Sequence, residues 1–436
     1  MSPVGSPAET PPDALNCAAG DSTRGYPGAS STSSATVTTS TTGTSMDATR
    51  GFIVGTRGSA LALAQTQLVV DALTPHLSQP LDVQIITTHG DTTRAHLVDL
   101  AQQGHTGVFA NAIRRALLEG QIDLAVHSCK DLPADPCPGL EILAMPPRGA
   151  TADCLCTTAG WTLETLPEGA RVGTGSPRRA AQLLRVRPDL SIVPIRGNIE
   201  RRLCYLEEPV LNTPIGSASG SGDGSCSDAP LDAVVLAEAG LQRLAARDTE
   251  ADTVLRYISQ RLPFLPSPAQ GALALEVRMD TTPAPLRQAL LAINHQPTLL
   301  AAIAERALLR TLHAGCELPI GAEATAQVHP QTRGVELTLR AEILSPDGRK
   351  RNAVEHTVTV PQLSWAEESA EAAAAEIAAA EVAGAESAAG LLAAAPLDID
   401  PGLVDPAYYA EAHEAQLAAA YQLGQMVARR LQANAR

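Results

Sequence analysis

The sequence predicts an α/β protein: two α/β domains joined by a hinge, followed by a small C-terminal α+β domain. Residues 51–147 alternate short apolar runs with helical patterns, and a second alternation of the same kind follows Pro147. Such alternation is typical of a mostly parallel sheet covered by helices. From about residue 296 a helix is followed by the strands VELTLRAEIL and AVEHTVTV with a Pro-Asp-Gly turn between them, which predicts the smaller domain.

The length and composition agree with this fold class. A chain of 436 residues has room for roughly three domains of ~150 residues, and 44% hydrophobic residues are enough for real cores. The formal charge of −15 and the 3% aromatic content argue against a broad basic surface for nucleic acid. No apolar run of about 18 residues and no signal-like N-terminus occur. We therefore expect a cytoplasmic protein with neither a nucleic-acid nor a membrane partner. We also expect a monomer.

The chain begins with a segment that is not expected to fold. Residues 1–50 are rich in Ser, Thr, Gly and Pro and hold too little apolar surface to offset the entropy of ordering. A Gly/Ser-rich insertion at 207–230 and an Ala/Glu-rich insertion at 363–396 are predicted as a mobile loop and an exposed helical segment. The segment RLPFLPSPAQGALALEVR is predicted to cross back to the first domain. The predicted domains are therefore 51–147 with 272–292, then 148–271, and then 293–436.

The stretch QIDLAVHSCKDLP, residues 121–133, places polar side chains at the end of a buried strand. The helical segment GVFANAIRRALLEG precedes it, and Gly120 supplies the helix stop. Pro133 prevents further pairing, so Lys130 and Asp131 lie at the carboxyl end of the strand, where ligands bind in open α/β sheets. Asp131 could equally be a solvated loop acid or a cap. Other segments have to decide between these interpretations.

Arginines and hydroxyl groups recur at predicted helix starts. In GTGSPRRAAQLL, Ser176 suits the N-cap, so Arg178 and Arg179 fall in the first turn, where they oppose the helix dipole. Either both extend into water or an anion binds between them and the helix N-terminus. Similar positions in TRGSALALAQ and IRGNIERRL are held by Arg57, Ser59, Arg196, Asn198 and Arg202.

The cysteines and histidines do not form a metal-binding pattern. No pair among the eight cysteines has CxxC spacing, and Cys154 and Cys156 are predicted to be core thiols on a strand. His89 and His127 lack a second pair of ligands at suitable spacing. We therefore expect no metal ion.

Six segments in the same order resemble the porphobilinogen deaminases, also called hydroxymethylbilane synthases. They are TRGSALALAQ, GVFANAIRRALLEGQIDLAVHSCKDLP, VGTGSPRRAAQL, IRGNIERRL, AQGALALE and AERALLRTLHAGCELPIG, between residues 51 and 321. The resemblance implies two domains similar to periplasmic binding proteins around a cleft, and a third domain whose cysteine carries a dipyrromethane cofactor. The implied reaction is that of a transferase in haem biosynthesis. It adds four porphobilinogen molecules to this primer with loss of ammonia and then releases hydroxymethylbilane by hydrolysis.

The resemblance also implies roles for individual residues. Asp131 matches the catalytic acid, and Cys316 matches the cysteine in thioether linkage with the cofactor. Matches to cofactor-binding positions are Ser128, Lys130, Ser176, Arg178 and Arg179, and matches to substrate-binding positions are Arg57, Ser59, Phe109, Arg196 and Arg202. Thr106 stands where the family often has a lysine, so no cofactor contact is assigned there.

The implied chemistry fits these residue types. Each pyrrole carries two carboxylates, which guanidinium groups can bind in bidentate fashion. Loss of ammonia leaves a cationic azafulvene, for which one nearby carboxylate is a suitable stabiliser and proton shuttle. A non-catalytic solute-binding module for a polycarboxylate remains the alternative, because it would need the same arginines. It would not need Cys316, although an isolated cysteine can also be a small core filler.

Overall fold

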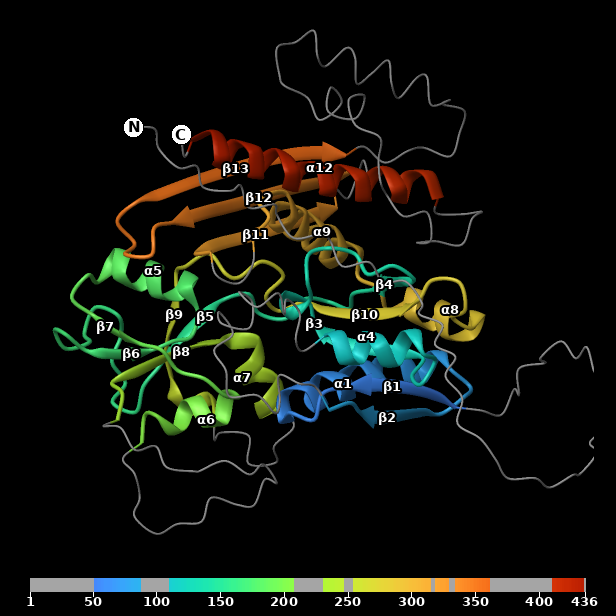
Figure 1. Cartoon of the computed structure of the whole chain (residues 1–436), viewed down its shortest axis with the longest axis horizontal. Helices are drawn as coiled ribbons and strands as arrows, with labels where there is room; N and C mark the ends of the chain where they lie inside the picture. Colours follow the sequence, from blue (N-terminus) through green and yellow to red (C-terminus); the bar gives the residue numbers. More distant parts are fainter. Residues whose placement is uncertain are drawn as a thin grey trace, which may run out of the picture. The chain divides into compact units, whose positions relative to one another are not determined.

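The computed structural model describes residues 51–87, 110–207, 230–246, 254–314, 318–328, 334–360 and 410–434, without the side chains of 360 and 410–414. These residues belong to one compact unit, Thr49–Arg436, and build three sheets (Figure 1). The predicted tail at 1–50, the insertion at 363–396 and residues 208–229 of the predicted loop lie outside the described residues. No described helix is both long and apolar enough to cross a lipid bilayer.

The first sheet has the strand order β2-β1-β3-β10-β4. Strands β1, β2 and β3 are parallel, whereas β10 runs antiparallel to both β3 and β4. Buried Val54, Leu124 and Leu275 contribute to its core. Its strands are β1 (Phe52–Thr56), β2 (Leu81–Ile85), β3 (Leu124–Ser128), β4 (Leu140–Ala144) and β10 (Leu273–Arg278), and its helices are α1 (Ala60–Leu73), α4 (Asn111–Leu118) and α8 (Ala284–Ile293), with the 3-10 turns η1 (Thr74–His76) and η2 (Cys129–Asp131).

The second sheet repeats this plan with the order β7-β6-β8-β5-β9. Strand β6 pairs in parallel with β7 and β8, and β5 is antiparallel to β8 and β9. Cys154 and Cys156 are fully buried on β5, which confirms that they are core thiols. Its strands are β5 (Asp153–Cys156), β6 (Arg171–Gly173), β7 (Ser191–Val193), β8 (Ala233–Ala237) and β9 (Ile258–Leu262), and its helices are α5 (Pro177–Val186), α6 (Ile199–Cys204), α7 (Glu238–Ala245) and the 3-10 turn η3 (Leu255–Tyr257).

The predicted mostly parallel sheets are confirmed in strand direction, because four of the five strands in each sheet run the same way and only β10 or β5 runs against them. The antiparallel pairings in the first sheet arise where the chain returns from the second one. Strand β9 ends at Leu262 in the second sheet, and β10 begins at Leu273 between β3 and β4 of the first. The segment RLPFLPSPAQGALALEVR therefore crosses back to the first sheet, as predicted.

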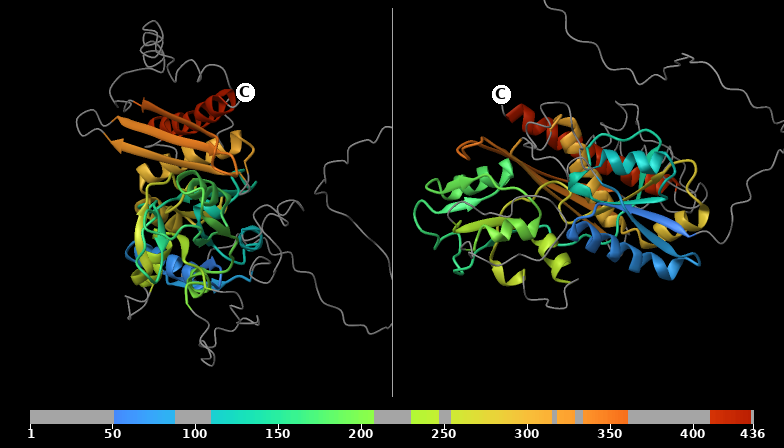
Figure 2. Two further views of the ribbon diagram at one scale, coloured as in Figure 1. Left: turned by 90° about the vertical axis from the view of Figure 1, so that its left-hand side faces the viewer. Right: turned by 60° about the horizontal axis from the view of Figure 1, so that its bottom comes forward.

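The C-terminal part is a three-stranded antiparallel sheet, β11-β12-β13, with two helices against it. Figure 2 shows both helices on the same side of the sheet, and Leu308 and Leu423 belong to the core that they share with it. The fold class, two α/β parts and a smaller α+β part, is confirmed, whereas the domain boundaries stay predictions. These elements are β11 (Ile320–Val328), β12 (Val335–Leu344), β13 (Arg351–Val360), α9 (Gln296–Thr311) and α12 (Ala410–Asn434).

Candidate active site

Asp131 lies on η2, the turn that directly follows β3. Strand β3 is buried from Leu124 to His127, because it pairs with β1 on one side and β10 on the other. Its parallel partner β1 ends nearby at Thr56, so the loop that opens α1 meets η2 at the same edge of the sheet. The prediction that Asp131 stands at the carboxyl end of a core strand is confirmed.

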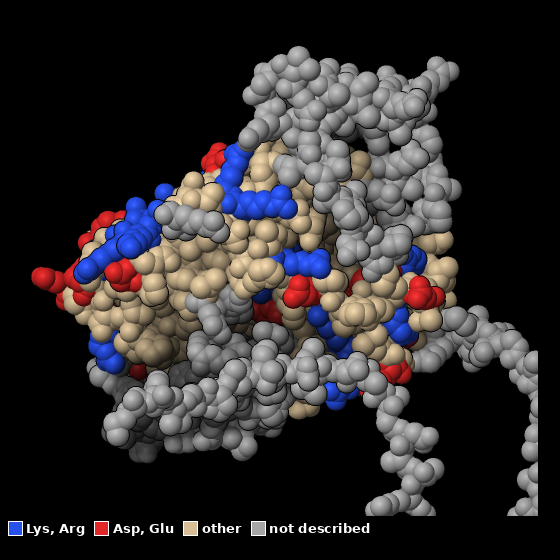
Figure 3. Space-filling model, turned by 45° about the horizontal axis from the view of Figure 1, so that its top comes forward, with Lys and Arg blue, Asp and Glu red and all other residues tan. Residues whose placement is uncertain are grey.

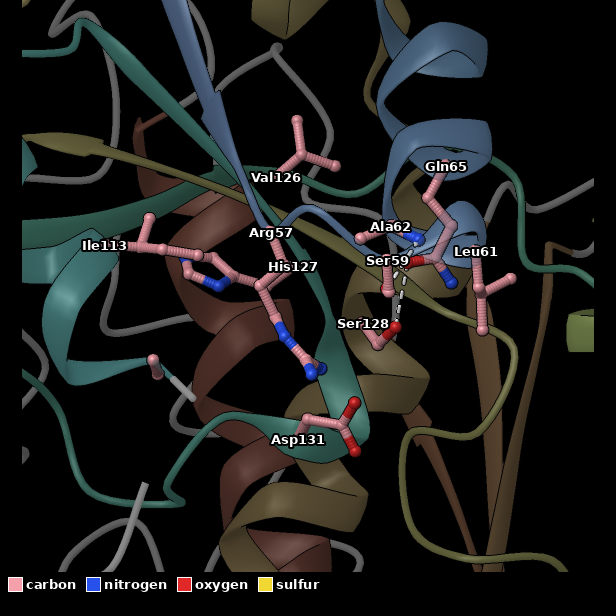
Figure 4. Close-up of a pocket in the computed structure, with 11 residues that line it drawn as sticks. Arg57, Ser59, Leu61, Ala62, Gln65, Ile113, Val126, His127, Ser128 and Asp131 are labelled. Carbon is pink, nitrogen blue, oxygen red and sulfur yellow. Dashed lines mark hydrogen bonds between the residues drawn. The ribbon is translucent and has the colours of Figure 1, made fainter. Parts of the chain in front are cut away.

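A pocket opens at this edge (Figure 4). The side chain of Arg57 extends toward the carboxylate of Asp131 across it. An acid and a guanidinium group thus share a cavity with apolar walls such as Ile113 and Val126. The residues that line it are Arg57, Ser59, Leu61, Ala62, Gln65, Ala110, Ile113, Val126, His127, Ser128 and Asp131.

Two hydroxyl groups of the pocket are held by the first turns of α1. Ser59 is the N-cap, and its Oγ accepts a hydrogen bond from the Ala62 backbone N–H at 3.3 Å. Ser128 Oγ donates to Gln65 Oε1 at 2.9 Å. The first bond was predicted from the N-cap pattern, whereas Gln65 was not recognised as a site residue. It lies one and a half turns into the helix with no sequence feature of its own.

Arg178 and Arg179 are buried, with only 4% and 6% of their surface exposed. They therefore do not extend into water, which was one of the two interpretations of their positions. Ser176 caps α5 as predicted, accepting from the Arg179 backbone N–H at 3.4 Å, and Pro177 is the first helical residue. Two guanidinium groups that are buried at a helix N-terminus require a negatively charged partner.

That partner is Asp153, the first residue of β5, which is fully buried. Arg179 donates to its Oδ1 from Nε at 3.0 Å and from Nη2 at 2.7 Å, and Arg178 Nη1 lies 2.7 Å from its Oδ2. Burial raises the pKa of Asp153, but the charges of Arg179 and Arg178 outweigh burial and hold the pKa well below its ordinary value. The carboxylate is therefore ionised.

Lys130 connects this ion-pair cluster to the pocket. Its Nζ donates at 3.1 Å to Gln270 Oε1, and Gln270 Nε2 donates at 2.9 Å to Asp153 Oδ1. Burial lowers the pKa of Lys130 to about 8; Asp131 raises it, and the like charges of Arg179 and Arg178 lower it. Lys130, Asp131 and the arginine pair thus act on one another, although they come from different sheets.

Arg202 joins the same electrostatic neighbourhood from α6, whose N-cap is Asn198 as predicted. Burial and the like charges of Arg179 and Arg196 lower the pKa of Arg202, while Asp131 raises it. Arg196 follows the buried Ile195 between β7 and α6. The predicted cationic residues therefore gather around Asp131 from both sheets.

A cofactor that carries several carboxylates fits these donors. The Nε atoms of Arg178 and Arg202 are buried and have no hydrogen-bond acceptor within the part of the chain that the structure describes. A buried guanidinium donor without an acceptor is costly, so an incoming carboxylate would be favoured there. On the face shown in Figure 3, basic and acidic side chains are interspersed on the described surface.

Two predicted site residues, Phe109 and Cys316, lie outside the described residues, and their roles stay predictions. Sequence reasoning missed Gln270, which is fully buried between Lys130 and Asp153. Its segment PAQGA was recognised as a crossing between domains, but not as a source of a site contact. The positive φ of 60° at Ala269, beside it, could not be read from the sequence.

Family models match most of the chain. Residues 52–284 match the porphobilinogen deaminase, dipyromethane cofactor binding domain, and residues 299–380 match the porphobilinogen deaminase C-terminal domain. The chain belongs to the porphobilinogen deaminase family. The first match spans both five-stranded sheets with Asp131 and the arginine pair, and the second begins in α9.

Curated relatives agree with this assignment. The chain is 42% identical over 319 residues to the porphobilinogen deaminase of Thermobifida fusca (strain YX), which covers 73% of this chain and 89% of the relative. It is 45% identical over 323 residues to that of Leifsonia xyli subsp. xyli (strain CTCB07), covering 73% and 87%. The relatives support the deaminase prediction and not the solute-binding alternative.

Two solved structures resemble the chain only weakly. The effector-binding domain of BenM with benzoate covers 56% of this chain and 91% of that chain at 13% identity, with a TM-score of 0.30. A Candida albicans protein with the generic periplasmic binding protein fold covers 61% and 72% at 10% identity, with a TM-score of 0.28. Scores this low bear on neither the fold nor the function of the deaminase.

Proposed function

We propose that this chain is a hydroxymethylbilane synthase. It joins four porphobilinogen molecules head to tail on a covalent dipyrromethane primer, loses one ammonia at each step, and releases hydroxymethylbilane by hydrolysis. The observation that carries the proposal is the carboxylate of Asp131 in a pocket shared with Arg57, surrounded by buried cations from two sheets. The family matches over 52–284 and 299–380 support it independently.

Asp131 is the proposed catalytic residue. When the aminomethyl nitrogen of porphobilinogen leaves as ammonia, positive charge develops on the pyrrole, and a carboxylate held at a strand end stabilises it without rearranging. The same carboxylate can carry the proton that the pyrrole carbon loses when the new carbon–carbon bond has formed. Its position on the short turn between β3 and Leu132 fixes it relative to Arg57.

The basic residues are proposed to bind the acetate and propionate groups of substrate and primer. Arg57, Ser59, Arg196, Arg202 and Phe109 are assigned to the substrate side of the site. Ser128, Lys130, Ser176, Arg178 and Arg179 are assigned to the primer, which supplies the free pyrrole position that is extended, with Cys316 as its covalent attachment. Ion pairs with Asp153 hold Arg178 and Arg179 in place for these carboxylates.

Other properties stay proposals from the sequence. They are the monomeric state, the cytoplasmic location, the absence of metal, nucleic-acid and membrane partners, and the three domains at 51–147 with 272–292, 148–271 and 293–436. The net charge of −15 supports the exclusion of nucleic acid, because it repels a polyanion.

Incubation of the purified protein with porphobilinogen tests the proposed function directly. One hydroxymethylbilane and four ammonia molecules are expected for every four substrate molecules consumed, and intact mass spectrometry should show a covalent dipyrromethane on the protein. A protein that binds porphobilinogen but releases no ammonia would support the solute-binding alternative instead.

A further inference from the structure

Arg178 is oriented by a neighbour one turn along its own helix. Its Nη1 donates to Gln182 Oε1 at 2.8 Å and to the backbone oxygen of Leu265 at 2.8 Å. The same Nη1 also forms an ion pair with Asp153 Oδ2 at 2.7 Å. The direction in which the guanidinium group points therefore depends on the amide of Gln182.

The amide of Gln182 can satisfy Arg178 in only one of its two orientations. A guanidinium group only donates, so it needs the amide oxygen, and the NH2 group must then face acceptors on the other side. Those acceptors are the Leu265 backbone oxygen at 2.9 Å and Glu342 Oε1 at 2.8 Å. Gln182 is only 2% exposed, so water does not replace them.

Glu342 is a buried carboxylate on β12 of the C-terminal sheet, with 6% of its surface exposed. Its Oε1 accepts from Gln182, and its Oε2 accepts at 2.7 Å from Arg351 Nε on the neighbouring strand β13. A carboxylate only accepts, so it determines which end of the Gln182 amide turns toward it. An uncharged side chain that can both donate and accept would not impose this polarity.

A second contact holds the C-terminal sheet against α5 at the same place. Gly348, in the turn between β12 and β13, has a φ of +70°, and a Cβ there would lie 2.3 Å from the Ala181 backbone oxygen and 2.6 Å from the Arg185 backbone nitrogen. Only glycine allows the turn to approach the helix so closely. The distance between β12 and α5 is therefore fixed by backbone contact.

We propose that Glu342 is a positioning residue for Arg178 and acts through the amide of Gln182. The C-terminal sheet then sets the direction of a guanidinium group that binds carboxylates of the primer and the growing chain. This inference rests on the proposed function, because it assigns Glu342 to the binding of substrate-derived carboxylates. Glu342 touches neither substrate nor primer and takes no part in the bond-forming step.

The central variants are Glu342→Met and Glu342→Gln. Methionine removes the acceptor at similar length, and glutamine can present either oxygen or NH2 to Gln182, so both lose the imposed polarity. The KM for porphobilinogen is expected to rise about 2- to 10-fold, as for loss of one hydrogen bond, while kcat changes less than about two-fold. Thr338→Val is the matched control on the same strand, because its hydroxyl contacts only Thr357, at 2.8 Å, among the side chains described.

An exchange of the two side chains separates positioning from packing. In Gln182→Glu combined with Glu342→Gln, the carboxylate at 182 accepts from Arg178, and the amide at 342 donates to it. The KM should fall below that of Glu342→Gln alone, since the donor–acceptor pairing between positions 182 and 342 is restored, while the Leu265 backbone oxygen keeps only its bond from Arg178. Gln182→Glu alone places two buried carboxylates together and should lower the melting temperature.

A double-mutant cycle identifies the residue on which Glu342 acts. The effect of Glu342→Met on KM should largely disappear when Arg178→Lys is also present, and it should persist when Arg57→Lys is present instead. Intact mass spectrometry of each variant should show the same covalent increment as the wild type, so the KM values compare equally loaded proteins. A lower melting temperature with unchanged KM, or full additivity with Arg178→Lys, would overturn the proposal. If the wild type and Thr338→Val release no ammonia, the proposed function itself is wrong.

Discussion

Gln270 accepts a hydrogen bond from Lys130 Nζ at 3.1 Å while its own NH2 group donates to Asp153 at 2.9 Å. The same NH2 group donates at 2.7 Å to the backbone oxygen of Thr151. One amide on the crossing segment therefore joins the turn that carries Asp131 to the ion pairs that hold the arginines. Lys130, Gln270 and Asp153 therefore form one continuous chain of hydrogen bonds.

The charge of Lys130 predicts an alkaline limit to catalysis. Burial lowers its pKa to about 8, so the ammonium group is present below this pH and is lost as the pH rises through it. Because the proposed carboxylate partners need the charged form, kcat/KM should fall above about pH 8. The same shift means that burial of the charged lysine costs stability below pH 8, a cost relieved as the pH rises toward its ordinary pKa.

Lys130→Met tests this assignment. At pH 7 the kcat/KM of the variant should be about 10- to 100-fold lower, as expected for loss of a hydrogen bond to a charged group. Its kcat/KM should also no longer fall as the pH rises through about 8. Lys350→Met is the matched control, since Lys350 is the only other lysine of the sequence and is exposed. If kcat/KM of Lys130→Met still falls at the same pH, another group causes the alkaline limit.

Asp153→Asn should destabilise the protein strongly. The substitution keeps the shape but leaves two buried guanidinium groups without a carboxylate, which costs about 3–5 kcal/mol of the free energy of unfolding. Urea unfolding at pH 7 measures it, with Asp189→Asn as control, because the Arg187–Asp189 pair is partly exposed and water can replace the lost carboxylate. Equal effects of the two substitutions would contradict the buried-pair interpretation.

The loss of stability in Asp153→Asn should depend on pH in a definite direction. The folded pKa of Asp153 lies below its ordinary value near 3.8, so its ionised form contributes stability above this pH. The contribution is lost as the pH falls through the depressed folded pKa. The difference in unfolding free energy between wild type and Asp153→Asn should therefore be constant near neutral pH and shrink in acid.

Local features of the site were predictable from the sequence, because they depend on neighbouring residues. The N-caps Ser59, Ser176 and Asn198 follow from residue type and the helix start that comes after each. The strand that delivers Asp131 follows from an apolar run between a glycine stop and a proline. These features need no knowledge of the partner elements.

Long-range contacts were not predictable in this way. The arginines at the start of α5 indicated an anion, but nothing in the sequence pattern identified Asp153 as its source within the protein. Gln270 meets Lys130 across 140 positions of the chain. Strand β11 was also missed, because its sequence IGAEATAQV is rich in alanine and lacks the β-branched alternation that indicates a strand.

Glu305 predicts a second large stability effect, at the contact between α9 and the crossing segment. This fully buried carboxylate accepts from Arg148 Nη1 at 2.7 Å and Nη2 at 2.9 Å, from the Ala324 backbone N–H at 2.6 Å, and from that of Ala269. Glu305→Gln removes the charge and one acceptor, leaving Arg148 without its carboxylate partner. The unfolding free energy should fall by about 3–5 kcal/mol in urea titrations.

The control for Glu305 is a carboxylate of the adjacent strand. Glu323→Gln removes a partner from Arg340, whose side chain is 50% exposed, and should cost no more than about 1 kcal/mol. If Glu305→Gln is no more destabilising than Glu323→Gln, the four donors do not depend on the charge of Glu305.

Substitutions of Cys316 and Asp131 should have different effects on primer content and activity, because the two residues are assigned different roles in one reaction. The thiol is needed once, when the primer is attached, so Cys316→Ser offers a far weaker nucleophile and should lack the dipyrromethane mass and all activity. The carboxylate is needed at every condensation. Asp131→Asn keeps the shape and removes the charge, so intact mass spectrometry should still find the primer while ammonia release falls by at least about 100-fold. Mass and activity therefore uncouple in one variant and are lost together in the other. A Cys316→Ser protein that carries the increment would disprove the thioether assignment, and normal turnover by Asp131→Asn would reduce the strand-end carboxylate to a structural cap.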